Sequence, residues 1–325
     1  MPVKSVGFAI GNLRAKENRM LKNSDMARFA SAGSLEELAG LLAEKGIGTG
    51  EGGDIPELLS AETRSLWEYL YDCAPDISVF EPFLLENDFH NLKTVLKGVL
   101  CGREYERLLI YPAGIDTKII EKAVCEKRFE LLDDFMKTAA ERAYRILLKT
   151  GDSQLSDCIA DAAQMTAQLK RADEIKKPLV LKLARASVFY GNIKAALRAA
   201  RAGKGRGFLE ECLTETGIVS KKALTGAALA GEKALLDLLA SAKELGGGLA
   251  AEEYKRSAGN FERFVDNYLL KTASESRYVT IGDEPLVGYM IAKQAEIKNL
   301  RIIYSGVKTG QPEEKIRERL RELNG

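Results

Sequence analysis

The stretch PLVGYMIAKQAEIKNLRIIYSGVKTG, from Pro285 to Gly310, decides the fold because its pattern occurs again elsewhere in the chain. A second stretch of the same length, Pro178 to Gly203, reads PLVLKLARASVFYGNIKAALRAARAG and also opens on Pro-Leu-Val. A third, Ile77 to Gly102, reads ISVFEPFLLENDFHNLKTVLKGVLCG and keeps the same register without a gap from Asn91 onward. Three matches in one register indicate an internal repeat.

Each copy has the pattern of an amphipathic helix. Its apolar residues are spaced three and four apart, which places them on one stripe. The stripes are Phe89/Leu92/Leu96/Val99, Tyr190/Ile193/Leu197/Ala200 and Ile297/Leu300/Tyr304/Val307. Each copy ends on a glycine (Gly102, Gly203 or Gly310), and glycine adopts positive φ at a helix C-terminus at little cost. One such copy alone is typical of an ordinary core helix. Three in register favour a chain of three similar helical units, which we place at residues 1–104, 105–205 and 206–325.

An asparagine stands beside each stripe, and a basic residue follows two positions later. The pairs are Asn91 with Lys93, Asn192 with Lys194, and Asn299 with Arg301. A partly buried amide needs partners, because an unmet one costs about 1–3 kcal/mol. We therefore expect each asparagine to bond a helix end or loop of its own unit, and each basic residue to point outward toward acidic partners. The alternative is that the asparagines face a partner directly. These six residues form the candidate structural and interface motif.

Small residues stand seven positions after each asparagine, on the same side of the helix. They are Gly98, Ala199 and Gly306. We expect this narrow strip to let another helix approach closely.

The rest of the chain also reads as helical. Ser34-Leu35-Glu36-Glu37 has the pattern of a capping box. Two strand-like stretches, Arg107 to Tyr111 and Arg277 to Ile281, are short and isolated, so we expect links between helices and an all-α fold. Further helices are expected at Val3 to Phe29, Thr117 to Lys137, Ala139 to Lys149, Asp157 to Lys170 and Pro312 to Leu323.

Composition narrows the class of protein. The 325 residues include 48 basic and 47 acidic ones, a balance that argues against nucleic-acid binding, which needs a clustered basic face. The five cysteines include no CxxC pair, so we expect reduced, mostly buried thiols in a cytoplasmic protein. The N-terminal apolar run is too short for a signal peptide, and no apolar run is long enough to span a membrane.

A search for chemistry finds no catalytic constellation. His90 is the single histidine, so it cannot build a histidine-based zinc site, and a surface or interface role fits it better. Gly48 to Gly53 formally matches GxGxxG, but a helix pattern precedes it and Pro56 follows, which favours a flexible loop over a nucleotide cradle. Acidic residues alternate with lysine and arginine, as on solvated faces. We expect no catalytic, cofactor or metal site and no direct nucleotide binding.

The repeat resembles a known family. Its acidic-x-x-Asn-Leu-basic helices, and the ending EIKNLRIIYSGVKTGQPEEKIRERL (Glu296 to Leu320), look like the C subunit of the V/A-type (vacuolar/archaeal-type) rotary ATPases, which is called the d subunit in the eukaryotic vacuolar enzyme. The resemblance covers essentially the whole chain, including an opening Asn12-Leu13-Arg14 triplet. The second copy departs most, since it has no acid at the place of Asp88.

This resemblance implies a funnel of three similar helical units with pseudo-threefold symmetry. It implies a place in the central stalk, between the rotor shaft, formed by the D and F subunits, and the membrane proteolipid ring. It also implies a non-catalytic, peripheral membrane role in passing torque for proton or sodium transport. Two other classes stay open: a helical-repeat adaptor and a nucleotide-dependent enzyme built on the Gly-rich loop. The asparagines lie roughly 100 residues apart, which is long for a solenoid repeat of 30 to 50 residues.

Overall fold

The computed structural model describes residues 6–48, 54–280 and 282–323. Within these residues it contains sixteen α-helices, five short 3-10 helices and no strand, so the all-α prediction is confirmed. The 3-10 turns Glu106–Leu108 (η2) and Ser274–Tyr278 (η5) overlap the two strand-like stretches, whose described residues link helices as expected; Ile281 lies outside the described residues.

The helices divide into two compact units, Met1–Ile77 with Glu253–Gly325, and Ser78–Glu252. The first compact unit holds α1 (Val6–Glu17), α2 (Asn23–Ala30), α3 (Leu35–Glu44), α4 (Ile55–Cys73), α14 (Ala258–Ala273), η5, α15 (Glu284–Lys308) and α16 (Glu313–Arg317). The second holds α5 (Glu81–Cys101), η2, α6 (Thr117–Cys125), η3 (Phe129–Leu131), α7 (Asp134–Thr150), α8 (Ser153–Ile175), α9 (Pro178–Arg201), α10 (Arg206–Cys212), α11 (Lys221–Ala230), α12 (Glu232–Ser241) and η4 (Lys243–Leu245). Two elements, η1 (Ile77–Phe80) and α13 (Gly247–Arg256), cross the boundaries between them. The division into three repeat units stays a prediction.

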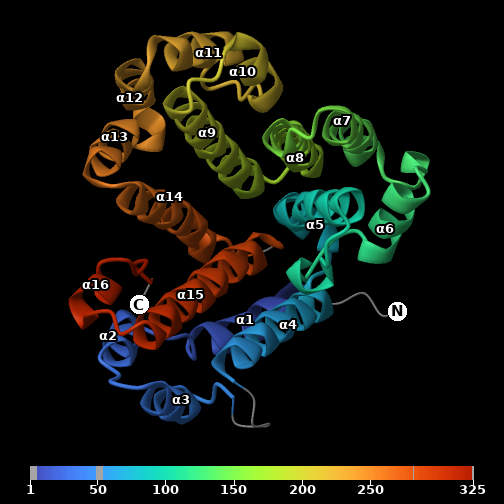
Figure 1. Ribbon diagram of the computed structural model, residues 1–325. Helices are drawn as coiled ribbons and strands as arrows, with labels where there is room; N and C mark the ends of the chain where they lie inside the picture. The colour runs from blue at the N-terminus through green and yellow to red at the C-terminus, as the bar shows by residue number, and fades with distance from the viewer. Residues whose placement is uncertain (1–5, 49–53, 281, 324–325) are drawn as a thin grey trace. The chain divides into compact units, whose positions relative to one another are not determined.

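Helix α15 organises the first compact unit (Figure 1). It contacts α1, α2, α3, α4, α14 and α16. Its apolar stripe enters a core in which Leu300 and Ile303 pack with Phe29 of α2 and Leu38 of α3. The repeat copy that ends the chain is therefore the central helix of its unit.

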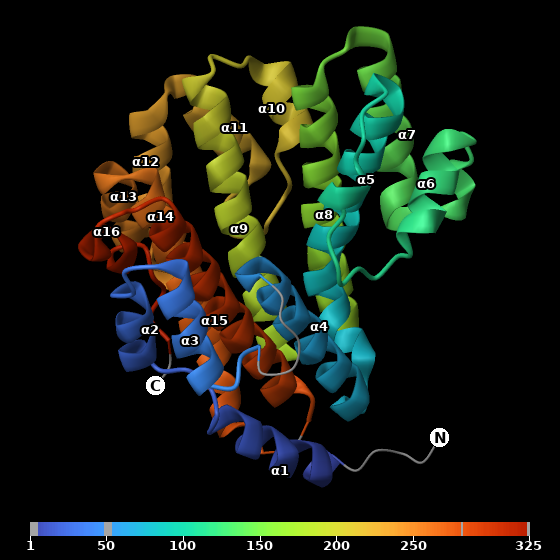
Figure 2. The same cartoon turned by 60° about the horizontal axis from the view of Figure 1, so that its bottom comes forward.

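The second compact unit is built on the neighbouring helices α5, α8 and α9. Helix α8 contacts α5, α7, α9 and α10, and Figure 2 shows α7 and α8 lying side by side. The stripe residues Phe89, Leu92 and Leu96 are buried in a core with Ile120 and Met136. Helix α9 in turn contacts α10, α11 and α12. The repeat helices α5 and α9 thus share the second compact unit, whereas α15 lies in the first.

The predicted helix stops are confirmed. Gly102, Gly203 and Gly310 have φ of 62°, 63° and 64°, the left-handed region that favours glycine. Ser34 also begins a helix as expected, since its side chain accepts a hydrogen bond from the Glu37 N–H at 3.2 Å.

Three predicted helices are interrupted or cut short, and the other two, Ala139 to Lys149 and Asp157 to Lys170, lie inside the longer α7 and α8. The stretch Val3 to Phe29 breaks between α1 and α2, and Pro312 to Leu323 is helical only at α16. Thr117 to Lys137 breaks because Lys127 adopts φ 58° after α6, and Asp133 then caps α7 through the Met136 N–H at 2.9 Å. Asp133 was a readable start signal within the predicted helix.

The small-residue strip receives side chains of the following segment. A Cβ on Gly98 would lie 2.0 Å from Tyr105 Cδ1, and one on Gly306 would lie 2.5 Å from Ile316 Cγ1. Ile316 belongs to α16, so a helix approaches in the third copy, as expected. Tyr105 lies in the link before η2, so in the first copy the expectation of a helix was wrong.

The cysteines are free, as expected, but the expectation that most are buried was wrong. Cys73 and Cys212 are buried, Cys158 is intermediate, and Cys101 and Cys125 are exposed.

Gly98→Ala should lower the free energy of unfolding by about 1–3 kcal/mol, because its methyl group overlaps the Tyr105 ring. Gly226→Ala is the matched control in α11, where a Cβ meets nothing within 4 Å. The control should leave stability unchanged or raise it by up to about 1 kcal/mol through helix propensity. Urea unfolding of both variants checks this, and equal effects would show that the strip is not closely packed.

Candidate structural and interface motif

The three asparagines of the repeat occupy equivalent buried positions. Asn91 lies on α5, Asn192 on α9 and Asn299 on α15, with exposed fractions of 0%, 1% and 0%. A primary amide carries two donors and an acceptor, so burial at this depth requires partners for both of its ends.

Each amide closes a two-bond ring with the backbone of one residue beyond the end of its own helix. In every case Nδ2 donates to that residue's carbonyl oxygen, and Oδ1 accepts from the same residue's N–H. The pairs are Asn91 with Ile110 (3.0 and 2.8 Å), Asn192 with Thr214 (2.6 and 3.0 Å) and Asn299 with Arg321 (2.9 and 2.8 Å). We call this arrangement the amide clasp.

The amide clasp fixes the path of the segment that follows each repeat helix. The clasped residues lie 19, 22 and 22 positions after their asparagines. None of the three is in a helix, so each needs partners for its backbone groups from elsewhere. The asparagine takes the place that a neighbouring strand would take. This is why the predicted helix through Leu323 is wrong: clasped Arg321 is not helical.

Each asparagine bonds a non-helical segment, as expected. The expectation that this segment lies within the asparagine's own predicted unit was wrong for the first two copies. Ile110 and Thr214 lie beyond residues 104 and 205, the ends predicted for the first two units. Each of these clasps therefore ties a repeat helix to the segment that follows it. Only Arg321 lies within the unit predicted for its asparagine.

The basic residues differ among the copies. Lys93 is partly buried, and its ammonium pairs with Asp161 of α8 at 2.5 Å, so it does not point freely outward. Lys194 is also only partly exposed. Arg301 is exposed on α15, as the sequence predicted for all three. The interface role of these residues stays a prediction.

The first copy adds further polar ties between α5 and residues 108–115. Asn87 donates to the Pro112 carbonyl at 2.7 Å, and His90 Nε2 lies 3.1 Å from the Leu108 carbonyl, to which it can only donate. Asp88 Oδ1 accepts from the N–H groups of Gly114 and Ile115 at 2.7 and 3.0 Å. His90 therefore helps to hold a loop.

Burial raises the pKa of Asp88 to about 6. The two backbone hydrogen bonds counteract only part of this effect, and Asp133 adds to it. The side chain is only 3% exposed.

Buried carboxylates were missed by the sequence reasoning, which placed acidic residues on solvated faces. Glu296, three residues before Asn299, has an exposed fraction of 0% and accepts from the Leu21 N–H at 3.0 Å. Lys293 pairs with Glu296 and lies 3.3 Å from Glu62 of α4. The signal was present, because Asp88 and Glu296 share the acidic-x-x-Asn spacing, which puts acid and amide on one side of a helix.

A fourth ring of the same kind fixes the C-terminal segment. Asn23 Nδ2 donates to the Leu323 carbonyl at 2.9 Å, and Oδ1 accepts from the Leu323 N–H at 2.9 Å. Asn23 is the first residue of α2. The Arg321 guanidinium also bonds Asp266 of α14, at 2.7 Å through Nε. Asn12, in the opening triplet, is exposed and does not repeat the pattern.

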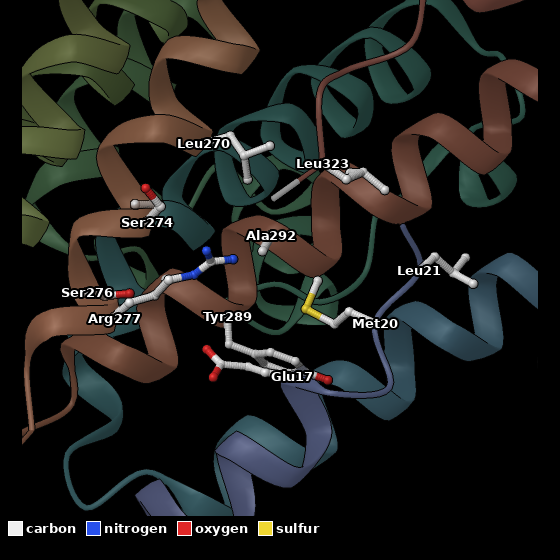
Figure 3. A pocket seen from close by; sticks show the side chains of 12 residues that line it. Glu17, Met20, Leu21, Leu270, Ser274, Ser276, Arg277, Tyr289, Ala292 and Leu323 are labelled. Carbon is white, nitrogen blue, oxygen red and sulfur yellow. The ribbon is translucent and has the colours of Figure 1, made fainter. Parts of the chain in front are cut away.

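Two hollows in the first compact unit can be compared with typical ligand pockets by volume and by lining residues. One cavity of about 50 Å³ lies among Glu17, Met20, Arg277 and Tyr289 (Figure 3), and it is far below the 300–1,000 Å³ typical of ligand pockets. A more open hollow of about 540 Å³ is lined by Lys298, Lys315, Arg319 and Arg321, but also by Glu262 and Glu318. That lining has no aromatic side chain to stack on a base.

The described residues hold no group of three side chains suited to bind a metal ion. Of the Gly48 to Gly53 stretch, residues 49–53 lie outside the described part of the chain. Among the described helices, none combines the length and apolar character needed to cross a membrane.

The geometry defines an all-α protein whose long repeated helices are tied by buried amides to the segments that follow them. The chain belongs to the family described as ATP synthase (C/AC39) subunit, whose model matches residues 9–319. It is 22% identical over 318 residues to the C subunit of the V-type sodium ATPase of Enterococcus hirae, covering 96% of each chain. It is 21% identical over 337 residues to the C subunit of the A-type ATP synthase of Methanocaldococcus jannaschii, covering 94% of this chain and 84% of that protein. The resemblance seen in the sequence is confirmed.

Asn299→Ala should lower the free energy of unfolding by about 1–3 kcal/mol, because it leaves the Arg321 N–H and carbonyl without their partner. Asn299→Asp is the matched variant: it keeps the acceptor, loses the donor and buries a charge. Both should be destabilised in urea unfolding. An unchanged alanine variant would show that the clasp adds nothing to stability.

Asp88→Asn should change the pH dependence of stability. The native pKa of Asp88, about 6, exceeds the ordinary value of 3.8, so the folded state binds this proton more tightly. Ionisation therefore costs stability as pH rises from about 4 to 6, by roughly 2–3 kcal/mol in total. The asparagine keeps an acceptor for Gly114 and Ile115 without the charge.

The stability of Asp88→Asn relative to wild type should accordingly rise across this interval and stay level above it. Urea unfolding at three values, about pH 4.5, 6 and 7.5, measures the difference. Asp88→Ala, which removes the acceptor, should instead be destabilised at every pH. A difference between Asp88→Asn and wild type that does not vary with pH would contradict the pKa.

Proposed function

We propose that the chain is a non-catalytic subunit of a V/A-type rotary ATPase, placed in the central stalk. In this role it turns with the shaft of the D and F subunits and with the membrane proteolipid ring, and passes torque between them for proton or sodium transport. The observation that carries the proposal is the family match over residues 9–319. The names of the two relatives, C subunits of a V-type sodium ATPase and of an A-type ATP synthase, support it.

The polar ties of the repeat helices suit a part that transmits torque. Such a part has to keep its shape under load, and close-packed interiors have low compressibility. The amide clasps add directional bonds at equivalent points on α5, α9 and α15, where apolar packing alone tolerates sliding. We propose that the three repeat units form a funnel with pseudo-threefold symmetry around these helices.

Arg301 is the best candidate in the motif for a contact with another subunit. It is exposed on α15, two residues from the buried clasp of Asn299, whereas Lys93 is paired with Asp161. A rigidly placed exposed guanidinium suits an acidic surface, because it offers several donors in fixed geometry. We propose that Arg301 meets an acidic partner in the rotor and that the chain is peripheral to the membrane.

Co-purification tests the proposal. A tagged chain expressed in its native cell should bring down the D and F subunits and the proteolipid ring. If it elutes with unrelated proteins and without these subunits, an adaptor role is favoured. Tight ATP binding by the isolated chain in calorimetry would favour the nucleotide-dependent enzyme.

Arg301→Glu should weaken assembly at least tenfold while leaving the melting temperature unchanged, because the side chain is exposed and the substitution opposes an acidic partner. Binding of the purified variant to a complex of the D and F subunits measures the effect. Arg145→Glu, at an exposed arginine on α7, is the control and should bind as wild type does. Loss of melting temperature in Arg301→Glu would assign the residue a structural role instead.

A further inference from the structure

Two cysteines of the second compact unit face each other across α8 and α10. Cys158 lies in the first turns of α8, and Cys212 is the last residue of α10. Each thiol shifts the pKa of the other through a side-chain interaction, which makes the two side chains neighbours. The two helices contact one another in the same compact unit.

Backbone register places the two cysteines together independently of the thiols. Cys158, Ala162 and Thr166 are four residues apart and therefore share one face of α8. Thr214, two residues after Cys212, donates its hydroxyl to the Ala162 carbonyl at 2.8 Å and lies 3.4 Å from Thr166 Oγ1. The segment after α10 thus runs along the face of α8 that carries Cys158.

The amide clasp holds this register. Asn192 binds both backbone groups of Thr214, which is 6% exposed. Cys212 therefore has little freedom to move away from Cys158. A disulfide requires its two Cα atoms to lie within about 7 Å, and the register set by Thr214 keeps Cys212 against the face of α8 that carries Cys158.

We propose that Cys158 and Cys212 form a redox modification site, at which a small-molecule disulfide such as oxidised glutathione converts the two thiols into an intramolecular disulfide. This site is separate from the proposed rotor role and does not depend on it.

Exposure and charge decide which sulfur reacts first. Cys158 is partly exposed, whereas Cys212 is 2% exposed. The hydrogen bond with Cys212 lowers the pKa of Cys158, and the same bond together with burial raises the pKa of Cys212. Asp161 and Asp157 beside Cys158 oppose its ionisation, but each is paired with a lysine of α5, at 2.5 and 3.1 Å. Cys158 is thus the attacking thiol.

The reaction balances in two exchanges. The Cys158 thiolate attacks one sulfur of oxidised glutathione, forms a mixed disulfide and releases one glutathione thiolate. Cys212 then loses its proton to solvent or to that leaving thiolate, attacks the Cys158 sulfur and releases the second glutathione. Two protein thiols are oxidised, and one glutathione disulfide is reduced to two thiols.

The bond would fix the end of α10 to α8 and close a loop between two positions that are 54 apart in the sequence. Loop closure of this length restricts the unfolded chain, so oxidation should raise the melting temperature by roughly 5–10 °C. The oxidised and reduced forms would then differ in the stiffness of the second compact unit.

The test uses two full-length variants. The pair-only variant carries Cys73→Ser, Cys101→Ser and Cys125→Ser and keeps Cys158 and Cys212. The matched pair-deleted variant keeps the other three cysteines and carries Cys158→Ser and Cys212→Ser. Circular dichroism first confirms that both fold, and each is then equilibrated in glutathione buffers of rising oxidised fraction.

The pair-only variant should lose the mass of two hydrogen atoms, yield a Cys158–Cys212 linked peptide and melt higher, all reversed by a thiol reductant. The pair-deleted variant should show no such rise. A pair-only variant that stays reduced, or that stops at a glutathione adduct on Cys158, would overturn the proposal. If the substitutions impair folding, wild type mapped in the same buffers decides the matter: a dominant disulfide between other cysteines would also overturn it.

Discussion

The amide clasp is the constraint from which much of this structure follows. An asparagine buried on a long helix and a non-helical segment leaving that helix each carry unpaired polar groups, and either alone would be costly away from water. Pairing them in a two-bond ring removes both costs at once. The ring also ties the path of the segment to the rotation of the helix. In Asn91, Asn192 and Asn299 the same solution appears at equivalent positions, although the clasped residues Ile110, Thr214 and Arg321 differ completely in side chain. The clasp bonds only the backbone atoms of the clasped residue, so the side chain at that position is free to vary.

The chemistry of the clasp explains why asparagine recurs. The backbone of one residue presents a donor and an acceptor on the same edge, and a primary amide presents the complementary pair on one planar group. Aspartate lacks the donor, serine lacks the planar pair, and glutamine adds a methylene with its rotational freedom. The neighbouring carboxylates, Asp88 and Glu296, extend the same logic by accepting from backbone N–H groups of other segments. Repeat helices therefore combine an apolar stripe, which drives burial, with a polar strip, which selects the segments they hold.

What the sequence predicted well was local. Gly102, Gly203 and Gly310 end helices because a positive φ is a property of one residue, and the apolar stripes follow from helical spacing alone. The failures were set by residues far along the chain. The expected helix from Val3 to Phe29 breaks where Leu21 bonds Glu296, 275 positions away, and the expected helix to Leu323 ends because Asn299 and Asn23 hold that segment.

Burial of the asparagines was predictable from their place beside the stripe. Their partners were not predictable. The clasp bonds only backbone atoms, so it imposes no residue type on the segment that it binds. The pairing of Lys93 with Asp161 was hidden for a related reason, since it depends on how α8 lies against α5.

The buried hydrogen bonds of the clasps also restrict the core to one relative position of its helices and segments. Apolar contacts tolerate small slides, because many packings of similar volume have similar energy. A buried ring such as that of Asn192 with Thr214 has no such tolerance: a slide of one residue leaves two donors and two acceptors unpaired in a dry interior. The apolar stripe then supplies most of the stability, and the clasp, besides its own contribution to stability, fixes the geometry. For a member of the ATP synthase (C/AC39) subunit family, holding a fixed geometry is a requirement that selection can act on directly. The recurrence of the clasp in all three copies is what that requirement predicts.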